Sequence, residues 1–156
     1  MTISLLCIGK TDSKEISSLL ENYEKRLRHY IRFERLELPD VKRKNLSPAQ
    51  QKSAEADLLL KKLSPSDQVI LLDEKGKEFR SVEWSAQLES KMVQGTKRLV
   101  FVVGGPYGFD EQIYKRANSK MSLSRMTFSH QMVRLFFVEQ LYRAFTIIRK
   151  EPYHHE

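Results

Sequence analysis

An apolar run that leads directly into glycines is the feature that most restricts the fold of this chain. Leu99–Val103 (LVFVV) contains no polar residue, and Gly104-Gly105-Pro106-Tyr107-Gly108 follows it at once. A short strand of this kind is typical of a sheet that is buried on both faces. Glycines at its end leave backbone amides uncovered at the carboxyl edge of the sheet, where open α/β folds bind ligands. We therefore expect an α/β fold with a ligand site after this strand.

Short apolar runs alternate with amphipathic segments along the rest of the chain, and this alternation predicts a mainly parallel sheet flanked by helices. We expect strands at Thr2–Ile8, Phe33–Leu38, Val69–Leu72, Leu99–Val103 and Met121–Leu123. We expect helices after a capping residue at Asp12, from Ser47 to about Leu63, at Ser81–Val93, near Glu111–Arg116 and at about Ser129–Arg149. The polar segments Asp40–Asn45 and Asp73–Lys77 are expected to form a loop and a turn. The 156 residues show no repeat and no linker, so a single domain over residues 1–156 is predicted.

The charge of the chain favours a polyanionic partner. The net charge is +7, and the segment from Glu111 to Glu156 holds eight Lys or Arg against four Asp or Glu, so +4 of the +7 lies there. A basic surface beside a ligand site favours nucleic acid as the partner. A surface that is generally basic and merely soluble is the alternative interpretation.

Two features bear on the compartment. Cys7 is the one cysteine, so no internal disulfide can form, and its apolar surroundings predict a small core residue in a reducing compartment. The N-terminus lacks the basic region of a signal peptide. The long apolar segment Met132–Ile148 carries three charged residues, which argue against a membrane span. We therefore expect a cytoplasmic protein with no membrane association.

The segment Met132–Ile148 also bears on the assembly of the protein. Apolar side chains appear on nearly every side when its residues are placed at helical steps, and such a helix must be covered on more than one side. Because the sheet of one thin domain covers a single side, we expect the other side to pack against a second copy in a symmetric homodimer. Burial of the helix within one subunit is the alternative.

Candidate chemical groups lie in two loops and in the helix that follows the second loop. Gly104-Gly105 would let a ligand approach the backbone closely, although such turns are often only tight strand exits. His130 could act as an acid, a base or an RNA contact, or it could only cap or pack the helix that it is expected to begin. Arg134 and Arg143 could bind a phosphate or a base, and structural ion pairing, as between Arg143 and Glu139, is the alternative.

The C-terminal residues Tyr153-His154-His155-Glu156 offer an aromatic ring and two imidazoles, although such tails are often disordered. Other common signatures are missing from the sequence. It contains no dinucleotide-binding GxGxxG, no phosphate-binding GxxxxGK[ST], no Cys/His metal spacing and no Ser-His-Asp elbow. Nicotinamide, nucleoside triphosphate, metal-dependent and acyl-transfer chemistry are therefore not supported, and no metal is expected.

Several segments in combination resemble a known family. VGGPYG at Val103–Gly108, MSLSRMTFSHQMVR at Met121–Arg134, EQLYRAF at Glu139–Phe145 and PYH at Pro152–His154 are similar to the RlmH family of the SPOUT superfamily. Members of this family are bacterial 23S rRNA pseudouridine N3-methyltransferases. LLCIGK at Leu5–Lys10 and YEKR at Tyr23–Arg26 fit the family as well, so the likeness covers the whole chain.

The resemblance implies a fold, a methyl donor and a donor site. SPOUT enzymes have a parallel α/β sheet flanked by helices, with a C-terminal part threaded into a trefoil knot, and S-adenosylmethionine binds in the knot loops. Carried over by position, the donor contacts are Leu72, Gly104, Leu123, Ser124, Arg125, Met126, Thr127 and Phe128. Gly105 is also expected to contact the donor, because it follows the buried strand Leu99–Val103.

The resemblance also implies the partners. The family is homodimeric, each active site lies at the subunit interface, and the substrate is 23S rRNA in the assembled 70S ribosome. Removal of the N3 proton needs a base or a cationic setting. The candidates, among which the sequence does not choose, are His130, Arg134, Arg143, Tyr153 and His154. The family is expected to have a basic residue after the Tyr-His pair, whereas this chain has His155 there. This difference would weaken a charge contact with rRNA.

Three other functions remain open at this point. The chain could be a SPOUT methyltransferase that acts on tRNA or on another rRNA position. It could be a non-catalytic RNA-binding dimer that no longer binds the donor. A flavodoxin-like cofactor protein is a third possibility, but the sequence contains no recognisable phosphate loop.

Overall fold

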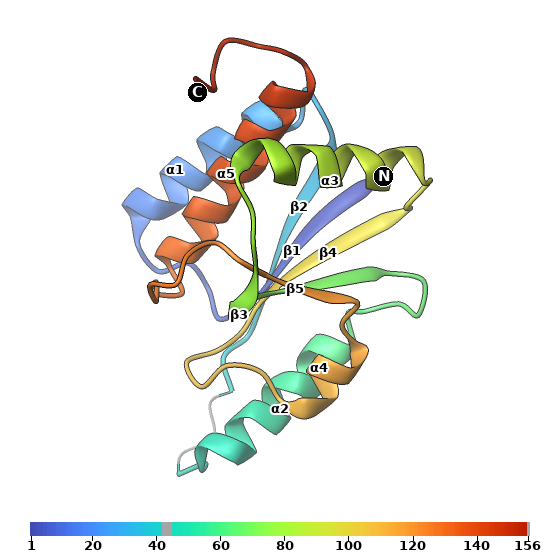
Figure 1. Ribbon diagram of the computed structural model, residues 1–156. Coiled ribbons are helices and arrows are strands. Elements are labelled where there is room, and N and C mark those ends of the chain that lie inside the picture. Colours follow the sequence, from blue (N-terminus) through green and yellow to red (C-terminus); the bar gives the residue numbers. More distant parts are fainter. Residues whose placement is uncertain (42–44, 156) are drawn as a thin grey trace.

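Parallel strands form the centre of the structure in the computed structural model, which describes residues 1–41 and 45–155 (Figure 1). Within those residues the strands are β1 (Thr2–Ile8), β2 (Arg32–Leu38), β3 (Gln68–Glu78), β4 (Arg98–Val103) and β5 (Ser119–Ser122). They lie in the order β2-β1-β4-β3-β5, and every pairing between them is parallel. The helices are α1 (Lys14–Leu27), α2 (Pro48–Leu60), α3 (Ser81–Val93), α4 (Glu111–Arg116) and α5 (Met132–Ile148). The predicted parallel α/β sheet is therefore confirmed.

Alternate residues of the strands enter two separate hydrophobic cores. In β1, Ile3, Leu5 and Cys7 point to the face covered by α1, α3 and α5, whereas Leu6 and Ile8 point to the face covered by α2 and α4 (Figure 1). This alternation follows from the two-residue period of a strand. Both faces are apolar because both are covered, which explains the uninterrupted apolar run of β4.

The helix ends agree in part with the sequence prediction. The predicted start of α2 is confirmed, because Ser47 and Gln50 form a reciprocal capping box with Pro48 as the first helical residue. The predicted cap of α1 at Asp12 is wrong, since Ser13 accepts the hydrogen bond from the Ile16 amide at 3.2 Å. Serine at this position reaches the amide three residues ahead, as a capping residue does, whereas Asp12 lies one residue too early.

The prediction of a turn at Asp73–Lys77 is wrong. β3 continues through this segment to Glu78, and its register on β5 is interrupted by a bulge, so that Leu72 and Lys77 both lie opposite Met121. A Cβ atom on Gly76 would lie 2.5 Å from the carbonyl carbon of Met121. The glycine therefore allows two backbone segments to approach closely rather than to reverse direction. Of the predicted loop Asp40–Asn45, residues 42–44 lie outside the described part of the chain.

Gly76→Ala is expected to destabilise the protein by about 1–3 kcal/mol, because a methyl group there would overlap backbone that cannot turn away. Urea unfolding of the purified variant measures the change. Gly95→Asn is the matched control, since Gly95 has φ +76° and, in the part of the chain that the structure describes, no atom lies within 4 Å of its Cβ position. Asparagine tolerates this backbone conformation. A Gly76→Ala variant as stable as the control would contradict the close approach of β3 and β5.

α5 is covered by two neighbouring helices as well as by the sheet, which the prediction of a dimer did not assume. α5 lies on the sheet between α1 and α3, and its inward face, which includes Phe137, Leu141 and Phe145, is buried in one of the two cores (Figure 1). The reasoning that one subunit covers a single side of this helix is therefore wrong, because neighbouring helices cover two more. The outward stripe still carries partly exposed apolar side chains: Met132, Val133, Phe136 and Ile147. Within the described residues, no helix is both long and apolar enough to cross a membrane.

Candidate functional site

The ends of three adjacent strands bring the expected donor contacts together. β3 lies between β4 and β5, and Leu72 pairs with Val103 on one side and with Met121 on the other. Gly104 and Leu123 follow β4 and β5 directly, so they lie at the same edge of the sheet as Leu72. The sheet order therefore gathers segments separated by about fifty residues of sequence at the carboxyl edge where α/β folds bind ligands.

The loop 123–128 is held in place by side chains from neighbouring segments. The Thr127 hydroxyl donates a hydrogen bond to Glu74 at 3.3 Å, and Arg125 Nε donates to Glu78 at 3.3 Å. The Phe128 ring packs against the Phe136 ring of α5 with their centroids 4.9 Å apart. Met126, in contrast, is 76 % exposed. The loop is thus anchored at several points while its apex remains open to solvent.

The glycine loop that follows β4 makes room for the protein's own side chains. A Cβ atom on Gly104 would lie 3.1 Å from the Phe109 ring, and one on Gly105 would overlap the Glu55 carboxylate, 2.6 Å from its carbon. Gly108 has φ +77°, and its amide donates to the Gly105 carbonyl at 3.1 Å, which closes a tight turn around Pro106. Both glycines at the start of the loop are therefore needed for close packing.

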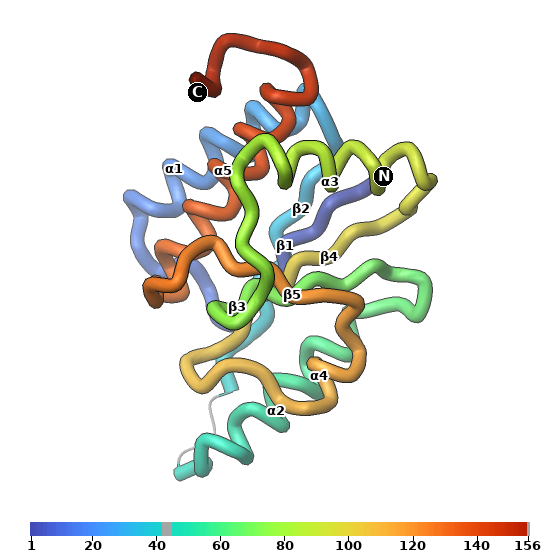
Figure 2. Tube along the Cα trace, viewed as in Figure 1, coloured from blue at the N-terminus to red at the C-terminus, as the bar shows by residue number. Residues whose placement is uncertain are grey.

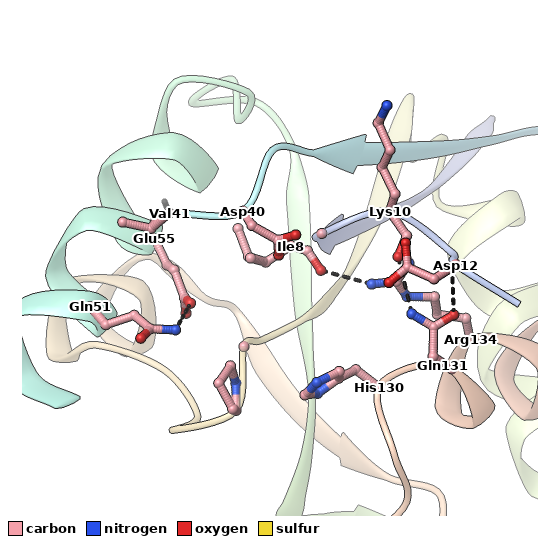
Figure 3. Close-up of a pocket in the computed structure, with 13 residues that line it drawn as sticks. Ile8, Lys10, Asp12, Asp40, Val41, Gln51, Glu55, His130, Gln131 and Arg134 are labelled. Atoms are coloured by element: carbon pink, nitrogen blue, oxygen red, sulfur yellow. Dashed lines mark hydrogen bonds between the residues drawn. The ribbon is translucent and has the colours of Figure 1, made fainter. Parts of the chain in front are cut away.

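A polar cavity of about 210 Å³ lies beside this loop, at the ends of β1, β2 and β4 (Figure 3). Gln51 and Glu55 of α2 stand on one side of it, and His130, Gln131 and Arg134 stand on the other. Gln131 ties this second side to the end of β1, because its amide group donates to the Lys10 carbonyl at 3.0 Å and accepts from the Asp12 amide at 3.1 Å.

Glu55 is the buried carboxylate of this cavity. Its residue is 3 % exposed, and it accepts hydrogen bonds from the Gln51 side chain at 2.9 Å and from the Gly105 backbone amide. Burial raises the pKa of the Glu55 carboxyl, and the negative charge of Asp40 acts in the same direction. Glu55 could not be selected from sequence alone, because nothing in the spacing of α2 relates it to a loop fifty residues away.

His130 and Arg134 border the same cavity in different ways. His130 is exposed and lies in the turn before α5, so the prediction that it begins the helix is wrong by two residues. The Ser129 hydroxyl accepts a hydrogen bond from the Met132 amide at 3.2 Å and so caps this turn, while α5 itself begins at Met132. Arg134 is 1 % exposed and donates to the Ile8 carbonyl at 2.7 Å and to the Thr11 hydroxyl at 3.0 Å. Its Nε atom has no partner among the described residues.

The remaining catalytic candidates belong to the last turns of α5 and to the tail that follows this helix (Figure 2). Arg143 donates to Glu139 at 2.6 Å, its guanidinium lies 4.8 Å from the centre of the Tyr153 ring, and its Nη1 lies 3.5 Å from Nδ1 of His154. Tyr153 also donates to Glu139 at 3.1 Å, so the tail folds back onto α5. Arg143 is nine residues beyond Arg134, which corresponds to about 13 Å along a helix. One subunit therefore holds the five candidates in two separate groups.

The chain is similar over almost its whole length to one family of proteins. A family model described as "Predicted SPOUT methyltransferase" matches residues 1–154. A protein of Christiangramia forsetii named "Ribosomal RNA large subunit methyltransferase H" is 61 % identical over 156 residues, which cover 99 % of each chain. Proteins of the same name from Flavobacterium johnsoniae and Parabacteroides distasonis are 61 % and 59 % identical over the full length of both chains.

Proposed function

The chain belongs to the SPOUT methyltransferase family, and from this we propose that it methylates ribosomal RNA of the large subunit. More specifically, we propose that it transfers a methyl group from S-adenosylmethionine to N3 of a pseudouridine in 23S rRNA of the assembled ribosome. The observation that carries the proposal is the identity of about three residues in five, over full length, to proteins named as ribosomal RNA large subunit methyltransferases. We place this activity in the cytoplasm, where ribosomes are found.

The residues at the edge of β3, β4 and β5 suit this donor. S-adenosylmethionine carries a positive sulfonium and a positive ammonium group, and the acidic residues Glu74 and Glu78 contact the loop 123–128. Leu72, Gly104 and the run Leu123–Phe128 would hold the donor, with Gly105 fixing the neighbouring turn. When bound, the donor supplies an electrophilic methyl group. We infer from family membership that the C-terminal part forms the trefoil knot.

The separation of the catalytic candidates supports a dimeric active site. His130 and Arg134 lie near the glycine loop, whereas Arg143 lies about 13 Å further along α5 than Arg134, with Tyr153 and His154 beside it. A second copy that packs on the outward stripe of α5 would bring its own Arg143 group to the glycine loop of the first. In this arrangement the protein is a homodimer, and each site takes residues from both subunits.

Mixing two inactive variants tests the shared site. His130→Ala and Arg143→Met are each expected to lose methyl transfer, whereas dimers re-formed from an equal mixture should recover about a quarter of wild-type activity, since half of them contain one intact site. The control mixes Arg143→Met with Tyr153→Phe, which damage the same group and should not complement each other. Equal activity of both mixtures would place the whole site within one subunit.

Methyl transfer itself is tested with labelled S-adenosylmethionine and 70S ribosomes from a strain that lacks this protein, with isolated 23S rRNA in parallel. We expect incorporation into ribosomes that maps to a pseudouridine in 23S rRNA. Donor binding without incorporation would indicate that the substrate is another RNA, such as tRNA. Calorimetry that detects no donor binding up to millimolar concentration would favour a non-catalytic RNA-binding protein.

A further inference from the structure

We propose that the cavity beside the glycine loop receives the target base of the RNA, and that the Glu55 carboxylate accepts the N3 proton of that base. The inference rests on the proposed methyl transfer and adds to it a substrate pocket and a proton acceptor. It assigns a role to a residue that neither the motifs nor the family resemblance selects.

The position of the cavity relative to the donor loops supports this assignment. β4 is the central strand of the sheet, and the donor contacts follow β3, β4 and β5, whereas the cavity lies at the ends of β1, β2 and β4. The glycine loop borders both regions, because Gly104 belongs to the donor contacts and Gly105 lines the cavity. A base in the cavity and a methyl group at the donor loops would therefore both lie against the glycine loop, next to each other.

The size of the cavity fits a single base. Its volume of about 210 Å³ is below the roughly 300–1,000 Å³ that pockets for drug-sized ligands enclose. Enzymes that modify a base turn it out of the stack into a close pocket and recognise its polar edge there. The cavity is thus suited to one pyrimidine ring and too small for a complete donor molecule.

The polar groups of the cavity match the edge of a uracil ring, in which an N–H lies between two carbonyl groups. Glu55 can accept a hydrogen bond from the N–H, while the side chain of Gln51 can donate to one of the carbonyls. Arg134 also borders the cavity and is 1 % exposed, so its positive charge lies close to a base that loses the N3 proton and would stabilise the anion that forms.

Glu55 differs from the other acidic residues of the cavity in its environment. Asp12 and Asp40 are exposed, whereas Glu55 is 3 % exposed and held by Gln51 and Gly105. Burial raises the pKa of the Glu55 carboxyl, which makes its ionised form a stronger proton acceptor. In the transfer step the N3–H bond breaks as its proton passes to Glu55. The N3 electron pair forms the new bond to the methyl carbon, and the electrons of the broken carbon–sulfur bond return to sulfur.

Glu55→Gln tests the role of the carboxylate, because glutamine keeps the shape and can still accept the hydrogen bond from Gly105. Single-turnover methyl transfer to unmodified 70S ribosomes is expected to fall by about 100-fold or more, as loss of a general base does. Donor affinity by calorimetry and the midpoint of thermal unfolding should not change. Asp57→Asn is the matched control, because it removes an exposed carboxylate from the same helix. This variant should transfer methyl groups at the wild-type rate.

Two results would overturn the proposal. If Glu55→Gln transferred methyl groups at the wild-type rate, Glu55 would not be the proton acceptor. If donor affinity fell in parallel with the transfer rate, Glu55 would act only by holding the glycine loop.

A second measurement separates failure of the pocket from failure of the proposed function. Pseudouridine 5′-monophosphate is titrated into ¹⁵N-labelled wild-type protein in the presence of S-adenosylhomocysteine. We expect the amide resonances of Gly9, Gly105 and Gln131 to shift, and the shifts to weaken in Glu55→Ala. These shifts would support the pocket even if wild-type protein transferred no methyl group to 23S rRNA. Their absence at saturating millimolar nucleotide would overturn the pocket even if transfer occurred.

Discussion

Gly105→Leu is expected to weaken binding of S-adenosylmethionine by about 100-fold, close to 3 kcal/mol, and to abolish methyl transfer. A side chain at this position would overlap the Glu55 carboxylate, which is buried and held by Gln51. Because α2 packs firmly on the sheet, the glycine loop has to move instead, and Gly104 moves with it. Calorimetry measures the donor affinity, and circular dichroism shows whether the variant remains folded.

A pair of smaller substitutions tests the stated cause. Gly105→Ala should weaken donor binding less than leucine does, by about tenfold. Adding Glu55→Ala removes the group with which the new methyl would collide, so the double variant should recover donor affinity. It should not recover methyl transfer, because the proposed proton acceptor is missing. If Gly105→Leu bound the donor with wild-type affinity, the glycine loop would not be part of the donor site.

The sheet could be predicted because its signals are local. Each buried strand is a short apolar run that ends at glycine, proline or a polar segment, and each helix carries its own cap or apolar spacing. The bulge in β3 could not be predicted, because DEKGK has the composition of a turn. What keeps this segment extended is pairing with β5, more than forty residues later in the chain. Tertiary pairing here outweighs local preference.

The loops that we propose to bind the donor could be located in the sequence, whereas the cavity beside them could not. Glycines after an apolar strand predict a loop at the sheet edge without knowledge of the fold. The contact between Glu55 and Gly105 depends on the packing of α2 on the second face of the sheet. In the same way, the apolar composition of α5 shows that the helix is covered but not that α1 and α3 cover it. The separation of Arg134 and Arg143, in contrast, follows from their nine-residue spacing, because nine residues of a helix span about 13 Å.

Arg134→Met is expected to destabilise the protein by about 3 kcal/mol, at the lower end of the 3–5 kcal/mol typical of a broken buried ion pair. Arg134 lies 3.6 Å from the Glu37 carboxylate and donates to the Ile8 carbonyl, which links α5 to β1 and β2. The cost stays at the lower end because Glu37 keeps two other partners, Arg35 and Thr11. Urea unfolding measures the change. Arg125→Met is the control, since its ion pair with Glu78 is exposed and contributes at most about 1 kcal/mol.

The pH dependence of this loss identifies the ion pair as its cause. Burial raises the pKa of Glu37, but the hydrogen bond from Thr11 and the positive charges of Arg35 and Arg134 outweigh burial, so the pKa lies below its ordinary value of 4.5. A carboxyl with a lowered pKa stabilises the fold fully above its unfolded value, and this contribution disappears as the pH falls through the folded value. The difference between wild type and Arg134→Met should therefore be largest near neutral pH and shrink in acid. If the difference stayed constant from pH 7 to pH 3, the loss of stability would come from packing of the arginine stem. If Arg134→Met lost activity without any change in stability, Arg134 would be a substrate contact instead.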